Sequence, residues 1–236
     1  ERAKSLISLN QATFIKEGIL VEVESNAMLS RIRMTTDKAD YQDAALVVES
    51  IVEKLDAKQA FWEEISALVP AEALLATNTS GLKITEIAKA CKHPERFMGQ
   101  HWLNPPHLLP LCEIIAGEQT APENVQKMRT LVKNLGKQPV VVADINGFII
   151  NRIQFALLRE ALHIVDIGAA TVEDVDTALK AGMGLRYAAL GPFGVADFGG
   201  LDTFDHINSY LNAELDDSKV GNLSLIHISE PTRPEP

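Results

Sequence analysis

The stretch PVVVADINGFIINRIQFALLREALHIVDIG, from Pro139 to Gly168, contains the change of pattern that divides the chain. Its first six residues form an apolar, β-branched run that is typical of a buried strand. From Ile153 onward, apolar residues recur at the spacing of one helix face up to Gly168, a residue type that often ends helices. The stretch therefore predicts a strand, a hinge at Asp144 to Gly147, and the first helix of a small helical domain.

Upstream of this stretch, strand-like and helix-like segments alternate. Short apolar runs lie at residues 45–50, 73–80, 96–102, 111–115 and 139–144. Segments with helical spacing lie between most of them, at 56–69, 84–91 and 122–136. This alternation predicts a parallel sheet with helices on its faces, the architecture used for dinucleotides. We predict an α/β fold of partial doubly wound Rossmann type, followed by an all-helical domain.

Composition and charge exclude several classes of protein. Of the 236 residues, 46% are hydrophobic and 23% are charged, as in an ordinary globular protein. The net charge of −10 and the lack of a Lys and Arg block argue against a nucleic-acid partner. No apolar run approaches the roughly 20 residues that span a bilayer, and Cys91 and Cys112 lack metal-ligand spacing. We expect a cytoplasmic protein without a membrane segment or a metal site.

Both ends of the chain have unusual sequences. The chain begins inside a helical pattern, without an initiating Met or a preceding strand, as a fragment would. Residues 223–236, LSLIHISEPTRPEP, differ in composition from what precedes them and resemble the conceptual translation of a sequencing-library adaptor. We expect these residues to be a non-native tail, the alternative being a genuine proline-rich tail.

Polar side chains follow several of the predicted strands. Because successive strands of a parallel sheet end at one edge, and ligands bind at that edge, these side chains are expected to converge. They are Glu49 and Glu53, then Asn78, Thr79 and Ser80, then His101 and Asn104. Asn78 and Ser80 have an alternative interpretation as turn residues that bond neighbouring backbone, and the residues alone leave both interpretations open.

His101 and Glu113 form a candidate catalytic pair. His101 ends a strand, Pro105 and Pro106 stiffen the following turn, and Glu113 lies in an apolar run where a buried carboxylate needs a partner. A carboxylate on one imidazole nitrogen fixes the tautomer and raises the basicity of the other nitrogen. We predict that His101 removes a proton from a substrate hydroxyl. His107 in the same turn is the rival base, and no acid accompanies it in the pattern.

Asn151 lies at the start of the predicted helical domain, next to the hinge. It is expected either to cap the helix, a role that Asn often fills, or to project its amide into the cleft between the domains and hold a substrate oxygen. Farther along, Thr171 and Asp174 occupy capping-box positions, and Gly182 is the predicted end of that second helix.

Five segments are informative as an ordered set: ATNTSGLKITEIA, PERFMGQHWLNPP, PLCEIIAGEQT, GKQPVVVADINGFIINR and GPFGVADFGGLDT. Together they resemble consecutive landmarks of the 3-hydroxyacyl-CoA dehydrogenases, and the resemblance extends from about Glu1 to Asp217. It implies NAD-dependent oxidation of the 3-hydroxyl group of a short-chain 3-hydroxyacyl-CoA. It also implies an incomplete NAD-binding domain at residues 1–144 and a truncated helical domain at 145–222 for substrate and dimerisation. We expect the full-length protein to be a homodimer.

The resemblance also implies roles for individual residues. His101 matches the family's catalytic base, and Glu113 matches the glutamate that orients it. Asn151 matches a catalytic asparagine and Ser80 a substrate-contacting serine, which favours the functional interpretation of both. Contacts with the nicotinamide half of NAD are implied for three further residues, Glu53, Lys58 and Asn78.

The sequence departs from the family pattern in two places. The glycine-rich phosphate loop, G-x-G-x-x-G, is expected upstream of Glu1 and is not present in the chain. The segment GMGLRYAALGPF inserts a longer loop around Arg186 and Tyr187, similar to the branch that contains L-gulonate 3-dehydrogenase (lambda-crystallin) and L-carnitine dehydrogenase.

This second departure leaves two alternatives to an acyl-CoA substrate. In the first, the substrate is a small hydroxy acid without CoA, and Arg186 binds its carboxylate bidentately rather than forming a surface ion pair. In the second, the chain is a non-catalytic, crystallin-like structural protein. The joint presence of His101, Glu113, Ser80 and Asn151 argues against the second alternative, because a structural protein need not keep that set.

Overall fold

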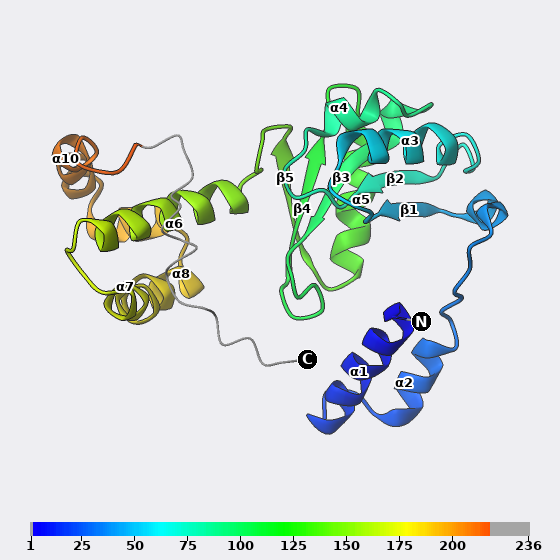
Figure 1. Cartoon of the computed structure of the whole chain (residues 1–236), viewed down its shortest axis with the longest axis horizontal. Helices are drawn as coiled ribbons and strands as arrows, with labels where there is room; N and C mark the ends of the chain where they lie inside the picture. The colour runs from blue at the N-terminus through cyan, green and yellow to red at the C-terminus, as the bar shows by residue number, and fades with distance from the viewer. Residues whose placement is uncertain (1, 218–236) are drawn as a thin grey trace.

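The structure is a computed structural model that describes residues 2–217 (Figure 1). Within that range five strands form one sheet: β1 (Leu46–Glu49), β2 (Leu74–Thr77), β3 (Phe97–Trp102), β4 (Leu111–Ala116) and β5 (Gln138–Ala143). The strands lie in the order β1-β2-β3-β4-β5, and each overlaps an apolar run that predicts it. The tail expected at residues 223–236 lies outside the described residues.

One pair of strands is antiparallel, which corrects the prediction of a parallel sheet for that pair. β1 with β2, β2 with β3, and β4 with β5 are parallel, whereas β3 and β4 are antiparallel. The reason is the β3–β4 connection, because residues 103–110 form a turn without a helix. Parallel strands need a crossover of about a dozen residues or more. In the antiparallel register His101 lies directly opposite Glu113.

Helices cover both faces of the sheet. Alternate residues of a strand point to opposite faces, so Leu74 and Leu75 enter different cores. On one side α3 (Leu55–Ile65) and α4 (Ile84–Ala88) enclose Leu75 and Trp62. On the other side α5 (Pro122–Asn134) packs Met128 against the sheet. The short helices η1 (Lys38–Asp43) and η2 (Pro94–Arg96) precede β1 and β3. This layered arrangement confirms the predicted Rossmann-type architecture.

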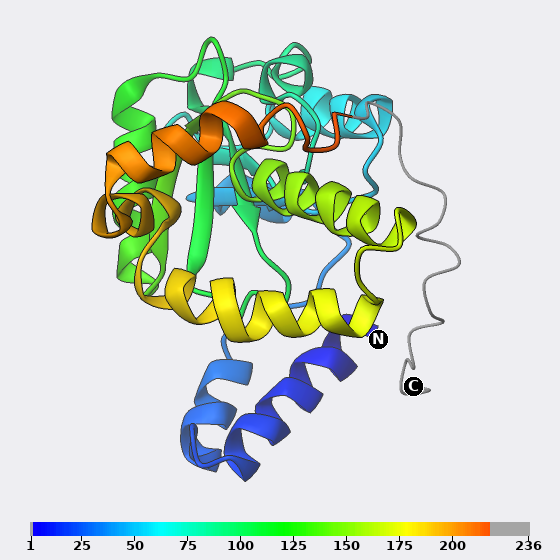
Figure 2. The ribbon, with the colours of Figure 1, turned by 90° about the vertical axis from the view of Figure 1, so that its left-hand side faces the viewer.

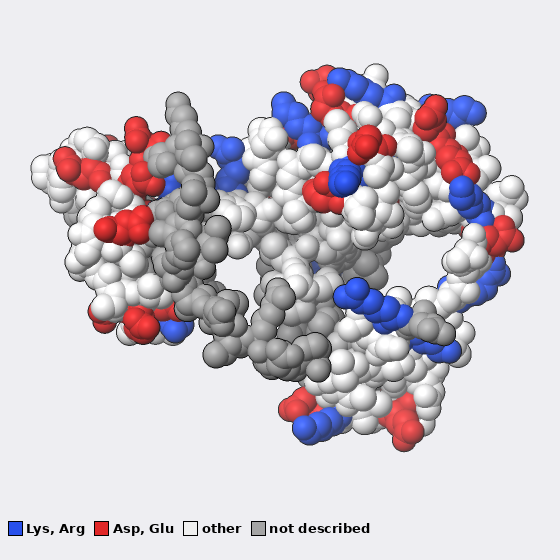
Figure 3. Space-filling model, viewed as in Figure 1, with Lys and Arg blue, Asp and Glu red and all other residues white. Residues whose placement is uncertain are grey.

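The first two helices stand away from the sheet. α1 (Arg2–Lys16) and α2 (Glu22–Leu29) form a hairpin below it in both ribbon views (Figure 1, Figure 2). No residue of α1 is buried. Across the face shown in Figure 3, Lys and Arg side chains are interspersed with Asp and Glu. Basic side chains therefore form no separate field on that face.

After β5 the described chain is helical, as predicted. The helices are α6 (Ile150–Asp166), α7 (Val172–Ala178), η3 (Leu179–Gly184), α8 (Leu185–Ala189), α9 (Pro192–Gly199) and α10 (Leu201–Leu211). They lie beside the sheet and are joined to it through α6 (Figure 1). Among the described helices, none combines the length and the apolar character needed to cross a bilayer.

Of the predicted helix boundaries, those at Gly168 and at Thr171 are confirmed and the one at Gly182 is not. Gly168 follows α6 with a φ of 71°, and the Thr171 hydroxyl accepts a hydrogen bond from the Asp174 N–H at 3.1 Å. The prediction for Gly182 is wrong, because helical structure continues through it to Ala189. Gly182 does not adopt the positive φ of a helix-ending glycine. The longer loop expected around Arg186 is therefore helical as well.

Candidate active site

His101 and Glu113 are joined by a short hydrogen bond. The antiparallel register places them on the same face of β3 and β4, with 2.7 Å between the His101 Nδ1 and the Glu113 Oε2. The His101 side chain is 4% exposed and the Glu113 side chain is 0% exposed. The partner that the sequence required for a buried carboxylate is therefore present, and it comes from the neighbouring strand.

The second oxygen of Glu113 binds the start of α6. Its Oε1 accepts hydrogen bonds from the backbone N–H groups of Ile149 at 2.8 Å and Ile150 at 3.1 Å. Burial alone would raise the pKa of Glu113, but the hydrogen bonds from His101, Ile149 and Ile150 lower it below its ordinary value. An ionised carboxylate only accepts hydrogen bonds, so His101 must carry its proton on Nδ1. The Nε2 of His101 is then the basic nitrogen.

The two backbone contacts to Glu113 were not predicted. The sequence does contain a signal for them, because Ile149 and Ile150 supply N–H groups of the first helical turn, which have no partner within the helix. A helix N-terminus also favours a nearby negative charge. A buried carboxylate and an uncapped apolar helix start are therefore complementary features.

Asn151 binds Ser80 across the two parts of the chain. Helix α6 begins after Ile149, so Asn151 lies in its first turn and the capping interpretation is wrong. The amide Nδ2 of Asn151 donates a hydrogen bond to the Ser80 carbonyl oxygen at 2.8 Å. Ser80 follows β2 and Glu113 lies within β4, so hydrogen bonds hold the start of α6 against the turn after β2 and against β4. An amide nitrogen carries two hydrogens, which leaves Asn151 with another donor at this position.

Glu53 and Lys58 belong to a second polar network at the end of β1. The Lys58 ammonium is completely buried and lies 2.7 Å from the Glu49 Oε1 and 3.4 Å from the Glu53 Oε2. The other oxygen of Glu53 accepts hydrogen bonds from the Thr79 hydroxyl and from the Ser80 N–H. Glu49 also belongs to this network. Its place at a strand end was predicted from the sequence, but its ion pair with Lys58 was not. This network ties the turn that contains Ser80 to β1.

The carboxylate of Glu53 remains accessible within this network. Its side chain is 45% exposed. Partial burial raises the pKa of Glu53, but hydrogen bonds from Thr79 and Ser80 and the charge of Lys58 lower it below the ordinary value. Glu53 therefore presents an ionised hydrogen-bond acceptor at the sheet edge. Lys58 is buried and contributes to that edge through its ion pair with Glu53.

Asn78 connects three strands at the same edge. Its backbone N–H donates to the Glu49 carbonyl at 2.8 Å, and its side-chain Oδ1 accepts from the Trp102 N–H at 3.1 Å. The turn interpretation of Asn78 therefore describes part of its role, since it bonds neighbouring backbone. Its side-chain nitrogen is the group that can serve a ligand.

Arg186 and His107 take no part in these hydrogen bonds, although His107 lines a shallow hollow together with Asn78 and Trp102. Arg186, on α8, lines a groove of about 640 Å³ together with Leu157, Glu160 and Asp174, and this groove includes none of the predicted catalytic residues. His107 packs edge-on against the Phe14 ring at 5.4 Å. The structure therefore brings together His101, Glu113, Ser80 and Asn151, but it does not add Arg186 to that group.

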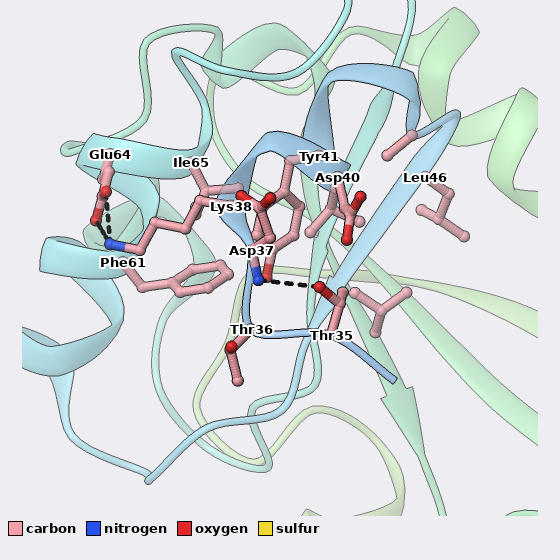
Figure 4. A pocket seen from close by; sticks show the side chains of 13 residues that line it. Thr35, Thr36, Asp37, Lys38, Asp40, Tyr41, Leu46, Phe61, Glu64 and Ile65 are labelled. Atoms are coloured by element: carbon pink, nitrogen blue, oxygen red, sulfur yellow. Dashed lines mark hydrogen bonds and ion pairs between the residues drawn. The ribbon is translucent and has the colours of Figure 1, made fainter. Parts of the chain in front are cut away.

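A further hollow of about 510 Å³ lies on the outer side of β1 (Figure 4). It is lined by residues of the η1 region and of α3, and the Lys38 Nζ binds the Glu64 Oε1 across it at 2.6 Å. None of the predicted site residues lines it. Within residues 2–217, no group of three or more His, Cys, Asp or Glu side chains is placed to hold a metal ion.

Comparison with known protein families decides what this arrangement belongs to. Residues 1–145 match the model of the 3-hydroxyacyl-CoA dehydrogenase NAD-binding domain, and residues 147–227 match that of the C-terminal domain. The chain belongs to the 3-hydroxyacyl-CoA dehydrogenase family. The family match confirms the resemblance seen in the sequence, and it confirms NAD as the cofactor of a dehydrogenase.

Three curated relatives show the range of this family. A 5-formyl-3-hydroxy-2-methylpyridine 4-carboxylate 5-dehydrogenase of Mesorhizobium japonicum is 39% identical over 217 residues, 91% of this chain and 69% of the relative. A 3-hydroxybutyryl-CoA dehydrogenase of Bradyrhizobium diazoefficiens is 37% identical over 90% of this chain and 72% of the relative. An L-carnitine dehydrogenase of Oceanobacillus iheyensis is 40% identical over 64% of this chain and 50% of the relative.

Solved structures of 3-hydroxyacyl-CoA dehydrogenase relatives have the same fold. The crystal structure of a 5-formyl-3-hydroxy-2-methylpyridine 4-carboxylic acid 5-dehydrogenase, described as an NAD⁺-dependent dismutase, superposes with a TM-score of 0.86 at 36% identity. The superposition covers 96% of this chain and 73% of that one. Relatives in the 3-hydroxyacyl-CoA dehydrogenase family are thus named for different hydroxy compounds, with and without CoA.

Proposed function

We propose that this protein oxidises the 3-hydroxyl group of a short-chain 3-hydroxyacyl-CoA to a ketone, with NAD as the hydride acceptor. The observation that carries the proposal is the buried His101–Glu113 pair, at 2.7 Å, beside the Asn151–Ser80 contact. Oxidation of an alcohol requires a base that can remove the hydroxyl proton and polar groups that position the substrate oxygen. A His101 with a fixed tautomer, together with Ser80 and Asn151, can supply both. Several relatives are named for 3-hydroxybutyryl-CoA, which supports this substrate class.

The protein's own groups have distinct parts in this reaction. The Nε2 of His101 takes the proton of the substrate hydroxyl, and the buried Glu113 carboxylate stabilises the imidazolium that forms. The Ser80 hydroxyl and the second amide hydrogen of Asn151 hold the oxygen that becomes the carbonyl. When bound, NAD supplies the acceptor for the hydride that leaves C3.

The end of β1 fits the nicotinamide half of NAD. Glu53 presents an ionised, half-exposed carboxylate there, and ribose hydroxyls are hydrogen-bond donors for such a group. Lys58 forms an ion pair with Glu53, and Asn78 can donate from its side-chain nitrogen at the end of the neighbouring strand. We assign these three residues to the cofactor and His101, Glu113, Ser80 and Asn151 to the reacting centre.

A second candidate substrate is a small hydroxy compound that bears a carboxylate and no CoA. Relatives named for L-carnitine and for a pyridine carboxylate support it. The chemistry at His101 would be the same, and the difference would lie in what binds the acid group. Arg186 is the residue proposed for that role, in a groove that also contains the carboxylates of Glu160 and Asp174.

Turnover of a substrate panel distinguishes the two candidates. For the full-length protein we expect kcat/KM with 3-hydroxybutyryl-CoA to exceed that with carnitine, gulonate or the pyridine carboxylate by about 10²-fold or more. NADH formation measures the rate. No turnover of the CoA ester, with turnover of one of the free acids, would overturn the acyl-CoA proposal. In that case Arg186→Met should raise KM for the acid at least about tenfold, and Lys180→Met, in η3 and outside the lining of that groove, should not.

We also propose that the helical domain associates with a second copy of the chain. Large apolar side chains are exposed along α8, α9 and α10, among them Leu185 at 71%, Phe193 at 90% and Phe198 at 82%. Monomeric proteins rarely expose apolar patches larger than several hundred Å². Light scattering on the full-length protein should give twice the mass of one chain, and Phe198→Asp should lower the fraction of dimer. A single-chain mass at high protein concentration would contradict this proposal.

A further inference from the structure

Phe148 has an unusual backbone conformation next to the proposed base. Gly147 has a φ of 76° and Phe148 a φ of 52°, so two successive residues lie in the left-handed region. Among the described residues, Phe148 is the non-glycine residue with positive φ. A bulky L-residue rarely adopts this conformation, and it persists where the surroundings determine it, often at active sites.

The left-handed turn places three groups against the His101–Glu113 pair. The Phe148 ring is fully buried, with its centroid 5.4 Å from that of His101 and the ring planes at 59°. The next two residues, Ile149 and Ile150, donate their N–H groups to Glu113. A different φ at residue 148 would change the direction of its Cβ and of the following N–H groups together. Ring contact and carboxylate binding are therefore set by the same turn.

We propose that Phe148 is a positioning residue that fixes the His101 ring and keeps water away from the His101–Glu113 hydrogen bond. The inference rests on the proposed function, in which His101 Nε2 must point at the substrate hydroxyl. One side of the imidazole is held by Glu113 through Nδ1, and the Phe148 ring restricts its rotation about that bond. Exclusion of water also strengthens a hydrogen bond to a charged acceptor.

A purely structural role for Phe148 makes different predictions. Phe148 is part of the core that α3 and α4 enclose, so its truncation destabilises the protein in either case. Phe97 offers a matched control, because it is another fully buried Phe of the same core, and its ring packs against Trp62 at 5.0 Å. Phe97→Leu removes the same atoms from that core without removing the ring that faces His101.

The test compares Phe148→Leu with Phe97→Leu in the full-length protein. The first readout is the NMR signal of the His101 Nδ1–H, assigned with His101→Gln, because it reports the hydrogen bond without cofactor or substrate. We expect Phe148→Leu to broaden this signal by faster exchange with water and Phe97→Leu to leave it sharp. The second readout is turnover, where we expect Phe148→Leu to lower kcat about 10- to 100-fold with KM nearly unchanged. The pH profile of kcat should shift in Phe148→Leu alone.

Phe148→Met keeps the test decisive if Phe148→Leu does not fold, since Met fills a similar volume without a ring. A sharp Nδ1–H signal and a kcat within twofold of wild type in either Phe148 variant would overturn the positioning role. His101→Gln, assayed in parallel, separates the two proposals. If that variant turns over at the wild-type rate, the proposed function fails, while the Nδ1–H signal still decides whether Phe148 positions the ring.

Discussion

His101→Gln is expected to lower kcat by about 10²- to 10⁴-fold, the usual contribution of a general base. Glutamine has a similar reach and keeps an N–H group for the Glu113 Oε2, but it has no basic nitrogen to take the substrate proton. The Kd for NAD should change less than about twofold, because the side chain of His101 is hydrogen-bonded to Glu113 and not to Glu53 or Lys58. Rapid-mixing measurement of NADH formation and calorimetric titration of NAD check the two halves of this expectation.

His107→Gln is the matched control for that experiment. His107 lies six residues farther along the β3–β4 turn and contacts Phe14 rather than an acid. We expect its removal to leave kcat within about twofold of wild type. Loss of turnover in His107→Gln together with an active His101→Gln would move the base to His107. Equal, undiminished rates in both variants would contradict base catalysis by either residue.

The fold was largely predictable because hydrophobic periodicity determines element type. The apolar runs give the five strands of the described chain, and the helical spacing after Asp144 gives the second domain. The direction of β4 was not predicted, because alternating strands and helices favour parallel pairing and only the length of residues 103–110 forbids it. The prediction that Gly182 ends a helix was also wrong. A helix-ending glycine of this type adopts a positive φ, and Gly182 does not.

The candidate site was predictable where a charge lay in an apolar run. Glu113 needed a partner once buried, and that argument leads to His101 without any structure. The backbone partners of Glu113 were not predicted, because its pairing was inferred from side chains only, whereas the signal for Ile149 and Ile150 is a helix start without a capping side chain. The same holds for Phe148, whose left-handed φ is set by the packing around it and not by its residue type.

Glu113→Gln is expected to lower kcat by about 10²- to 10⁴-fold although it removes no volume. Glu113 uses both oxygens as acceptors, one for His101 and one for Ile149 and Ile150. Glutamine has a single acceptor oxygen. If that oxygen faces the backbone, the NH₂ group faces Nδ1 and drives the imidazole proton to Nε2, which can then no longer act as a base. If it faces His101, the NH₂ group opposes two backbone donors at the start of α6.

The same substitution is expected to remove an acid dependence of stability. The folded-state pKa of Glu113 is lower than the ordinary value of 4.5, so its stabilisation is complete above about pH 4.5. This stabilisation is lost as the pH falls through the lowered folded-state value. At neutral pH we expect Glu113→Gln to unfold with about 1.5–3 kcal/mol less free energy than wild type. The difference between the two proteins should shrink below pH 4.5, as denaturant titrations at several pH values can measure.

Glu118→Gln provides the control, because Glu118 is an exposed carboxylate in the turn that follows β4. It should match wild type in kcat and in the pH dependence of unfolding. A Glu113→Gln enzyme with nearly wild-type turnover would show that the tautomer of His101 does not depend on the carboxylate. A stability difference that stays constant down to acid pH would show that Glu113 does not titrate as a charged partner of His101 and α6. Either result would contradict a charged carboxylate that serves the base and the helix at once, because that arrangement requires both effects from one substitution.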